Sequence, residues 1–347
     1  MIKLKYNFLL NFAVSHSGGG YKRLYEYARW FNENGGAWFV IHPRCEILIS
    51  EFPKNKFFLA TQPRYSRIFN DCVYLDNIGD EIGQPDFYYS YGVPVYAPFG
   101  KINWFHLSNV LPLGSRGIPL PLFDRLKLSY LGWRITHNFE NVDIISAESN
   151  YSLGLIDVKE NQESFLSVNG SNDELIYLQN KDVQIKDSIA TVLGTYSYKA
   201  LKDSYYVFEM LRRIDGKLKL IIIGDEKTIP NDLRNDNNII ALGVLPRCDV
   251  IEYLRKTKYY ISTTRIENSY NAASEGVFFA DESYISDIGP HRELLMNIPF
   301  NQISIPDMTR PVLHIKRENL SGLNLKTWEH VITEMIDKVC DKLRNLQ

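Results

Sequence analysis

Short apolar strands alternate with amphipathic helical segments in both halves of the chain, and this alternation constrains the fold most. In the first half, strands are predicted at 6–14, 37–42, 87–92, 102–108 and 142–149. In the second half, strands are predicted at 188–196, 217–225, 237–245, 258–264 and 282–289. Buried strands that alternate with helices are typical of a mostly parallel, doubly wound sheet. The sequence therefore predicts an α/β protein with two tandem Rossmann-like domains that face a cleft.

Helical periodicity fills the gaps between these strands. In the first half, one helical stripe contains Tyr21, Leu24, Ala28 and Phe31. Arg23 falls off this stripe, and Asn34-Gly35-Gly36 is a stop signal. Later helices are predicted at 199–213, 248–257 and 271–280, and the last amphipathic segment contains Val331, Ile332, Met335, Val339 and Leu343.

The polar stretch 171–187 has weak periodicity and marks the neighbourhood of a linker. We expect a first domain over 1–170, a second over 171–325, and a final helix over 326–347 that packs back toward the first domain. Ligands of open α/β sheets lie at the carboxyl ends of the strands, so the loops after strands are the places to look for a site.

Bulk composition excludes some classes of function. The 347 residues carry a formal net charge of −2, so no global basic field points to nucleic acid. The N-terminal run is short and interrupted by Asn7 and Asn11, and it indicates a strand rather than a signal peptide. The four cysteines show no metal-binding spacing, and we expect them reduced in a cytoplasmic protein: Cys45, Cys72, Cys248 and Cys340.

The segment 262–280 (STTRIENSYNAASEGVFFA) places Glu267 in a loop after a strand and Glu275 in the helix that follows. Residues eight apart converge only if the first precedes the helix. The helix N-terminus would offer backbone N–H donors to a phosphate, and the carboxylates would meet sugar or ribose hydroxyls. The alternative is a solvated loop glutamate and a surface ion pair, because this spacing is common by chance.

Three adjacent glycines, Gly18, Gly19 and Gly20, lie between the first strand and the first helix. Such a loop lets the backbone approach a ligand closely, or simply turns. A dinucleotide site would need G-x-G-x-x-G and an acid about 20 residues on. The glycines here are adjacent, and the next strand ends in His42-Pro43-Arg44 without an acid.

Several of these segments together resemble retaining GT-B glycosyltransferases of glycosyltransferase family 4. The segment 262–280 is similar to the family's E-x7-E signature, and 286–293 (SDIGPHRE) is similar to the stretch downstream of it. Gly194 and Lys199 match the family's glycine and lysine after the first strand of the second domain. Weaker matches are 167–174 (SVNGSNDE, with Asn172 one place from the usual aspartate), 220–225, 237–262 and the glycine segment.

The resemblance implies a retaining transfer of a sugar from a UDP-, GDP- or dTDP-sugar to a hydroxyl, by front-face displacement without a protein nucleophile. Glu267 would hold sugar hydroxyls and stabilise positive charge, Glu275 would hold the ribose, and Lys199 would bind the diphosphate. The loop residues would bind the diphosphate through their backbone: Asn268, Ser269, Tyr270 and Asn271. The glycines would close over the diphosphate from the first domain.

The chain departs from the family pattern at three positions. Thr195 stands where the family has an arginine. Either Lys199 stabilises the diphosphate without that arginine, or Arg247 or Arg265 takes its place. Those arginines could equally be solvated surface residues. Ala200 and Gly276 stand where glycine and alanine are usual, and neither change removes a functional side chain.

His106, at the end of a predicted strand, matches a family histidine near the donor sugar, so we expect a catalytic role for it beside a structural alternative. His16 is a second candidate. The chain has no D-x-D motif and no His/Cys cluster, which favours an enzyme without a metal or other cofactor.

Residues 110–139 are apolar, contain prolines and are basic, with four cations against one acid: Arg116, Arg125, Lys127, Arg134 and Asp124. Such a segment suits an anionic membrane surface, and a pair of buried core helices is the alternative. The composition resembles that of bacterial enzymes of O-antigen or capsule assembly. The expected acceptor is a glycan or polyprenyl-diphosphate oligosaccharide, met at the cytoplasmic face of the inner membrane. A non-catalytic nucleotide-sugar-binding protein and a GT-B epimerase remain alternatives.

Overall fold

The fold is described from a computed structural model, which describes residues 6–61, 72–170, 186–323 and 325–346. Two compact units divide the chain. The first unit comprises 1–115, 123–171 and 326–347, and the second comprises 116–122 and 172–325. Most of the polar stretch 171–187, and with it Asn172, lies outside the described residues.

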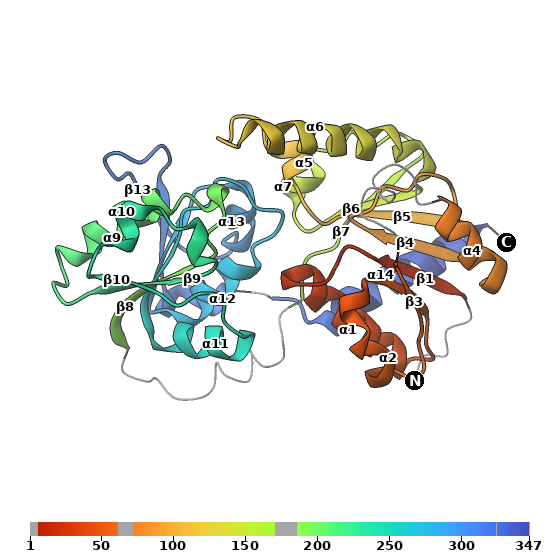
Figure 1. Cartoon of the computed structure of the whole chain (residues 1–347), viewed down its shortest axis with the longest axis horizontal. Coiled ribbons are helices and arrows are strands. Elements are labelled where there is room, and N and C mark those ends of the chain that lie inside the picture. Colours follow the sequence, from red (N-terminus) through yellow and green to blue (C-terminus); the bar gives the residue numbers. More distant parts are fainter. Residues whose placement is uncertain (1–5, 62–71, 171–185, 324, 347) are drawn as a thin grey trace. The chain divides into compact units, whose positions relative to one another are not determined.

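The first unit contains a parallel sheet with the strand order β3-β2-β1-β4-β5-β6-β7 (Figure 1). Its strands are β1 (Phe8–Phe12), β2 (Trp38–Ile41), β3 (Lys56–Leu59), β4 (Phe87–Tyr91), β5 (Ile102–Leu107), β6 (Ile144–Ala147) and β7 (Glu163–Leu166). All five strands predicted for this half are confirmed. The sequence pattern missed β3 and β7, the two edge strands, in which no residue is fully buried.

Helices cover both faces of this sheet. They are α1 (Gly18–Glu33), α2 (Ile47–Glu51), α4 (Cys72–Ile82), α5 (Leu111–Gly114), α6 (Leu122–His137), α7 (Asn150–Leu153) and α14 (Trp328–Asn345). Phe8, Leu10 and Phe12 pack with α1, α2 and α14, whereas Leu9 packs with α4, α6 and α7 on the other face. Strand β1 is therefore buried on both sides, as a central parallel strand requires.

Helix α1 differs from the sequence-based prediction in two ways. It begins at Gly18, so the three glycines form its first turn and are not a loop or tight turn ahead of it. Leu24, Ala28 and Phe31 are buried as predicted, but Arg23 is also fully buried, although it was placed off the apolar stripe. The buried face of α1 is wider than the stripe because Arg23 lies four residues before Tyr27, which is also buried.

The second unit contains a sheet with the strand order β10-β9-β8-β11-β12-β14-β13. Its strands are β8 (Asp187–Leu193), β9 (Lys219–Ile223), β10 (Ile239–Ala241), β11 (Thr257–Ser262), β12 (Glu282–Ser286), β13 (Asn301–Ile303) and β14 (Val312–Lys316). The five predicted strands are confirmed and run parallel. Strand β14, which was not predicted, runs antiparallel to β12 and β13.

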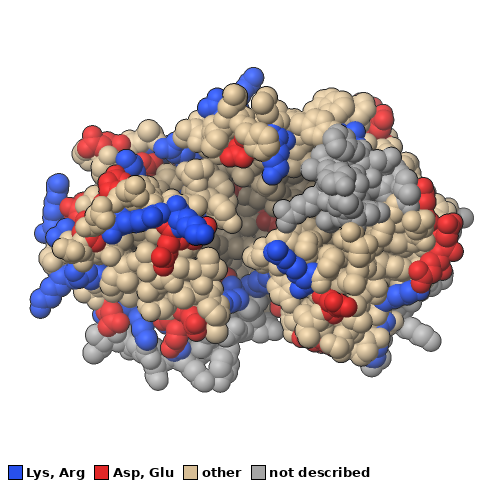
Figure 2. Space-filling model, in the orientation of Figure 1, with Lys and Arg blue, Asp and Glu red and all other residues tan. Residues whose placement is uncertain are grey.

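In the described part of this unit, the α-helices that flank the sheet are α9 (Leu201–Arg212), α10 (Asn231–Arg234), α11 (Arg247–Lys256), α12 (Asn271–Phe279) and α13 (Gly289–Leu294). One hydrophobic cluster lies under α9 and α10, and another under α11, α12 and α13. On the face shown in Figure 2, Lys and Arg side chains alternate with Asp and Glu over each unit, as expected from the small net charge.

The last helix, α14, belongs to the first unit. It buries Val331, Ile332, Met335, Ile336, Val339 and Leu343 in the same hydrophobic cluster as α1. Within the described ranges, no helix has both the length and the apolar character needed to cross a membrane.

Candidate functional site

The candidate site lies in the second unit, where the direction of strand succession reverses. From β8 the chain proceeds outward to β9 and β10, and then returns to β11 on the other side of β8. Strands β8 and β11 are parallel neighbours, so the loops that follow them meet at one edge of the sheet. Ligands of doubly wound sheets bind at the carboxyl ends of strands at such a point.

Direct contacts join the loops after β8 and β11. The Arg265 N–H donates to the Tyr198 carbonyl over 2.7 Å, and the Thr263 hydroxyl donates to the Ala200 carbonyl over 2.9 Å. Lys199, at the end of a short 3-10 helix (Ser197–Lys199), pairs with Glu267. The exposed fractions of the two side chains are 12% and 22%, so this ion pair is accessible but partly desolvated.

Glu267 precedes α12, as the sequence analysis required for convergence with Glu275. Helix α12 begins at Asn271, after an N-cap at Tyr270 whose side chain makes no capping hydrogen bond. The first N–H groups of any helix lack intrahelical acceptors, and the helix dipole adds partial positive charge there. The loop 268–271 therefore leads into an end of α12 suited to an anion.

Glu275 lies on the second turn of α12 and is 8% exposed. Its Oε1 accepts a hydrogen bond of 2.6 Å from Nη1 of Arg247, the first residue of α11. The Nε and Nη2 atoms of Arg247 are buried without partners in the described part of the chain. Arg247, one of the two arginines considered as substitutes for the missing family arginine, is therefore paired with Glu275.

The local backbone explains two departures from the family pattern. Ala200 has φ of 50°, a left-handed conformation that glycine adopts more readily than alanine. A Cβ atom at Gly276 would lie 2.3 Å from the Tyr260 ring, so only glycine lets α12 pack on β11 here. The two exchanges thus have opposite consequences: one leaves a strained residue, and the other removes a clash.

Thr195, at the position of the missing arginine, connects two loops. Its hydroxyl donates to the Asp225 carbonyl over 3.0 Å and accepts from the Thr228 hydroxyl over 2.6 Å. The residue is 5% exposed. Its visible role is to fix the loop after β8 to the loop after β9, and its predicted contact with the donor stays a prediction.

The predicted residues of the first unit lie at the carboxyl edge of its own sheet. Gly18, with φ of 59°, and Gly19 begin α1. A Cβ atom at Gly20 would lie 3.3 Å from both the Ser15 hydroxyl oxygen and the Tyr91 ring. The His16 ring contacts the His42 ring edge-on, with centroids 4.6 Å apart. The glycines thus allow close packing at the start of α1.

His106 is buried at this edge of the first sheet, with 0% exposure. Its Nδ1 lies 2.8 Å from the Ser146 hydroxyl, and its ring stacks on Tyr91. Burial, aided by the Arg23 charge and opposed by Glu148, lowers the pKa of His106 to about 4. The ring is therefore neutral at neutral pH and has no surface for a ligand in this structure. Its catalytic role stays a prediction.

Sequence reasoning missed two buried charges beside His106. The Arg23 guanidinium donates to the Ser167 and Val168 carbonyls over 2.8 and 3.1 Å and lies 3.9 Å from Glu148. It also lies over the Trp328 ring at 5.3 Å. Arg23 thus connects α1 to the residues that follow β7 and to the start of α14. The four- and three-residue spacing of Arg23, Tyr27 and Trp30 was the sequence signal for this second buried row.

Two sequence-based expectations concern metals and thiols. Among the described residues, no group of three or more His, Cys, Asp or Glu could hold a metal ion. The described thiols of Cys45, Cys248 and Cys340 are free.

No family model and no curated protein sequence matches this chain. Solved structures do match it. A sucrose-phosphate synthase from Thermosynechococcus elongatus is 10% identical, with a TM-score of 0.69 over 99% of this chain and 100% of the other. An E. coli trehalose-6-phosphate protein bound with UDP-2-fluoro glucose is 10% identical, with a TM-score of 0.55 over 84% and 86%. WaaG, a glycosyltransferase involved in lipopolysaccharide biosynthesis, is 10% identical, with a TM-score of 0.54 over 78% of each chain.

These three structures are GT-B glycosyltransferases, and the chain has their fold: two α/β units, each built on a parallel-dominated sheet of seven strands. The predicted fold class is confirmed. At about 10% identity the likeness concerns the fold, so residue roles must be argued from the site itself.

Proposed function

We propose that the protein is a retaining glycosyltransferase that moves a sugar from a nucleoside-diphosphate sugar to a hydroxyl of a lipid-linked oligosaccharide, in O-antigen, capsule or related glycan synthesis. One observation carries this proposal. Two ion pairs, Lys199–Glu267 and Arg247–Glu275, link the loop after β8 and the start of α11 to the loop before α12 and to α12 itself, at the point where strand order reverses.

This arrangement suits the departure of a nucleoside diphosphate. The leaving group gains negative charge, which the Lys199 ammonium and the N–H groups at the start of α12 would stabilise. Glu267 would accept hydrogen bonds from sugar hydroxyls and stabilise positive charge at the sugar. Glu275, held by Arg247, would accept from the ribose hydroxyls. No step in this scheme requires a metal ion, and we assign acceptor binding to the first unit.

Helix α6 supports a contact with an anionic membrane surface. It exposes large apolar side chains along most of its length, with exposed fractions of 73, 77, 62, 38 and 52% for Leu122, Phe123, Leu126, Tyr130 and Trp133. Only Gly132 and Ile135 of α6 are buried, so the alternative of a buried pair of core helices is wrong for this helix. Exposed Arg125 and Lys127 lie in the same turns. Apolar and basic side chains together favour the interface of an anionic bilayer.

The central experiment measures nucleotide affinity and sugar transfer in matched variants. UDP, GDP and dTDP, and their sugars, are titrated calorimetrically into the wild type, Lys199→Ala and Glu275→Ala. Each variant is expected to lose roughly tenfold or more in affinity, because a hydrogen bond to a charged group is removed. Lys258→Ala is the control: it also breaks an ion pair, of 3.2 Å with Asp215, but at the start of β11.

Unchanged nucleotide affinity in both site variants would show that Lys199 and Glu275 do not bind the donor. Transfer is followed by NMR of the product, in which the anomeric configuration of the donor is expected to persist. Nucleotide binding without transfer to any acceptor would favour the non-catalytic alternative, and interconversion of the free nucleotide-sugar would favour the epimerase.

A further inference from the structure

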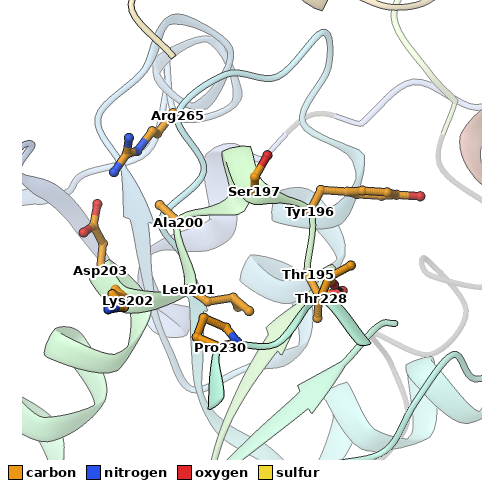
Figure 3. A pocket seen from close by; sticks show the side chains of 10 residues that line it. All are labelled: Thr195, Tyr196, Ser197, Ala200, Leu201, Lys202, Asp203, Thr228, Pro230 and Arg265. Carbon is orange, nitrogen blue, oxygen red and sulfur yellow. Dashed lines mark hydrogen bonds between the residues drawn. The ribbon is translucent and has the colours of Figure 1, made fainter. Parts of the chain in front are cut away.

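A pocket of about 220 Å³ opens in the second unit beside the candidate donor site (Figure 3). It lies between the loops after β8, β9 and β11 and the first turn of α9. Lys199, Glu267, Glu275 and Arg247 are not among its lining residues. The pocket therefore needs its own explanation.

Asp203, on the first turn of α9, is the buried acceptor of this pocket. The residue is 8% exposed, and its carboxylate has no hydrogen-bond partner within the described ranges. An acid at the third position of a helix often accepts from the N-cap N–H, but the Ala200 N–H donates to the Ser197 carbonyl instead. Burial raises the pKa of Asp203, which the Arg265 charge opposes. The carboxylate is thus partly desolvated, and the Arg265 charge compensates for part of this cost.

Arg265 supplies the facing donor. Its backbone is fixed by the bond to the Tyr198 carbonyl and by a bond of 2.9 Å from Arg310 to its own carbonyl. Its Nε is buried without a hydrogen-bond partner in the described chain. Figure 3 shows the Arg265 guanidinium and the Asp203 carboxylate turned toward each other from different elements. No ion pair of 4.0 Å or less joins these two described side chains.

The charges around the pocket restrict its ligand. An anion such as phosphate would face the Asp203 carboxylate, and a cation would face Arg265 and Lys202. A neutral molecule that both donates and accepts hydrogen bonds satisfies both walls. Adjacent hydroxyl groups on one ring have this property, because each hydroxyl is a donor and an acceptor.

We propose that this pocket is a carbohydrate subsite, in which one sugar hydroxyl donates to Asp203 while its neighbour accepts from Arg265. The subsite uses none of Lys199, Glu267, Glu275 and Arg247, on which the proposed donor site rests, although Thr195, a predicted donor contact, also lines it. It would hold a sugar ring that carries no nucleotide, such as a unit of a glycan.

The test is saturation-transfer NMR with nucleotide-free sugars: methyl glycosides of glucose, galactose, mannose and N-acetylglucosamine, and maltose and lactose. At least one is expected to bind the wild type. Asp203→Asn and Arg265→Gln are each expected to weaken that binding by about tenfold or more. Asp249→Asn and Arg234→Gln are matched controls, because both residues are exposed and neither lines the pocket, and Asp249 is also the third residue of a helix.

Thermal melting separates binding from a structural role. Asp203→Asn removes a desolvated charge, so its melting temperature at neutral pH is expected to equal or exceed that of the wild type. A clearly lower melting temperature, binding of none of the sugars, unchanged sugar binding in both pocket variants, or displacement of the sugar by inorganic phosphate would each overturn the subsite.

The two proposals fail independently. Asp203→Asn is expected to leave nucleotide affinity unchanged, and Lys199→Ala is expected to leave sugar binding unchanged. Loss of both activities in Asp203→Asn would contradict a separate subsite.

Discussion

At the residue scale, Ala200 is the clearest case of local strain near the candidate site. An L-residue in the left-handed region costs about 1–2 kcal/mol, whereas glycine loses more backbone entropy on folding, by about 0.5–1 kcal/mol. Ala200 has φ of 50° and joins Lys199 to the first turn of α9. The strain therefore lies in the backbone that presents the lysine.

We predict that Ala200→Gly raises the unfolding free energy by up to about 1 kcal/mol. Melting of the circular dichroism signal measures this change. Ala273→Gly in α12 is the control with the opposite sign, because a helix position loses about 1 kcal/mol on exchange to glycine, and the buried methyl group of Ala273 is lost as well. A lower melting temperature for Ala200→Gly would show that packing of the Ala200 methyl group stabilises the fold by more than the backbone strain costs.

At the element scale, α6 is a helix whose apolar side chains are turned outward. Phe123 and Trp133 are 77% and 52% exposed. Exposed apolar groups gathered on one helix mark an interaction surface rather than a core. The helix is thus the part of the chain by which membrane contact is best tested.

We predict that the wild type sediments with vesicles that contain anionic lipid, and that the double variant Phe123→Ser, Trp133→Ser loses this binding by about tenfold or more. Each large apolar side chain contributes about 1.5–3 kcal/mol when buried. The control is Ile47→Ser, Ile49→Ser, which removes exposed apolar groups from α2. Equal sedimentation of both double variants would exclude α6 as the contact.

The elements also show what the sequence could and could not predict. Ten strands and the helix α12 were predictable because long apolar runs and helical periods dominate there. Strands β13 and β14 escaped because β13 is a three-residue edge strand without a buried residue, and β14 pairs antiparallel with both of its neighbours. Lys199 and Glu267 are 68 residues apart in sequence, and Arg247 and Glu275 are 28 apart, so no local sequence pattern predicts either pairing.

At the scale of the whole molecule, each unit buries one neutral histidine. His106 lies in the first unit and His291 in the second, and burial lowers both pKa values from 6.5 to about 4. All five tryptophans (Trp30, Trp38, Trp104, Trp133 and Trp328) belong to the first unit. Tryptophan fluorescence therefore follows the unfolding of the first unit alone.

Because the unfolded histidines bind protons more readily, stability is fully present above pH 6.5 and is lost as pH falls toward 4. We predict a loss of about 2 kcal/mol per histidine between pH 7 and pH 5. His106→Gln should flatten the pH dependence of the fluorescence-detected transition in urea. His291→Gln should flatten the pH dependence of the transition followed by circular dichroism and leave that of the fluorescence-detected transition unchanged. His330→Gln, at an exposed position, is the control. An unchanged slope in His106→Gln would contradict the burial of a neutral ring.

The place of α14 has a consequence for the order in which the protein is made. One hydrophobic cluster of the first unit includes Trp328, Ile332 and Met335, which the ribosome adds only after all of the second unit. During translation the earlier residues of the first unit must wait with an incomplete core, while the second unit already has its full set of strands. The second unit is therefore free to fold first as the nascent chain emerges, and the first unit closes around the last helix.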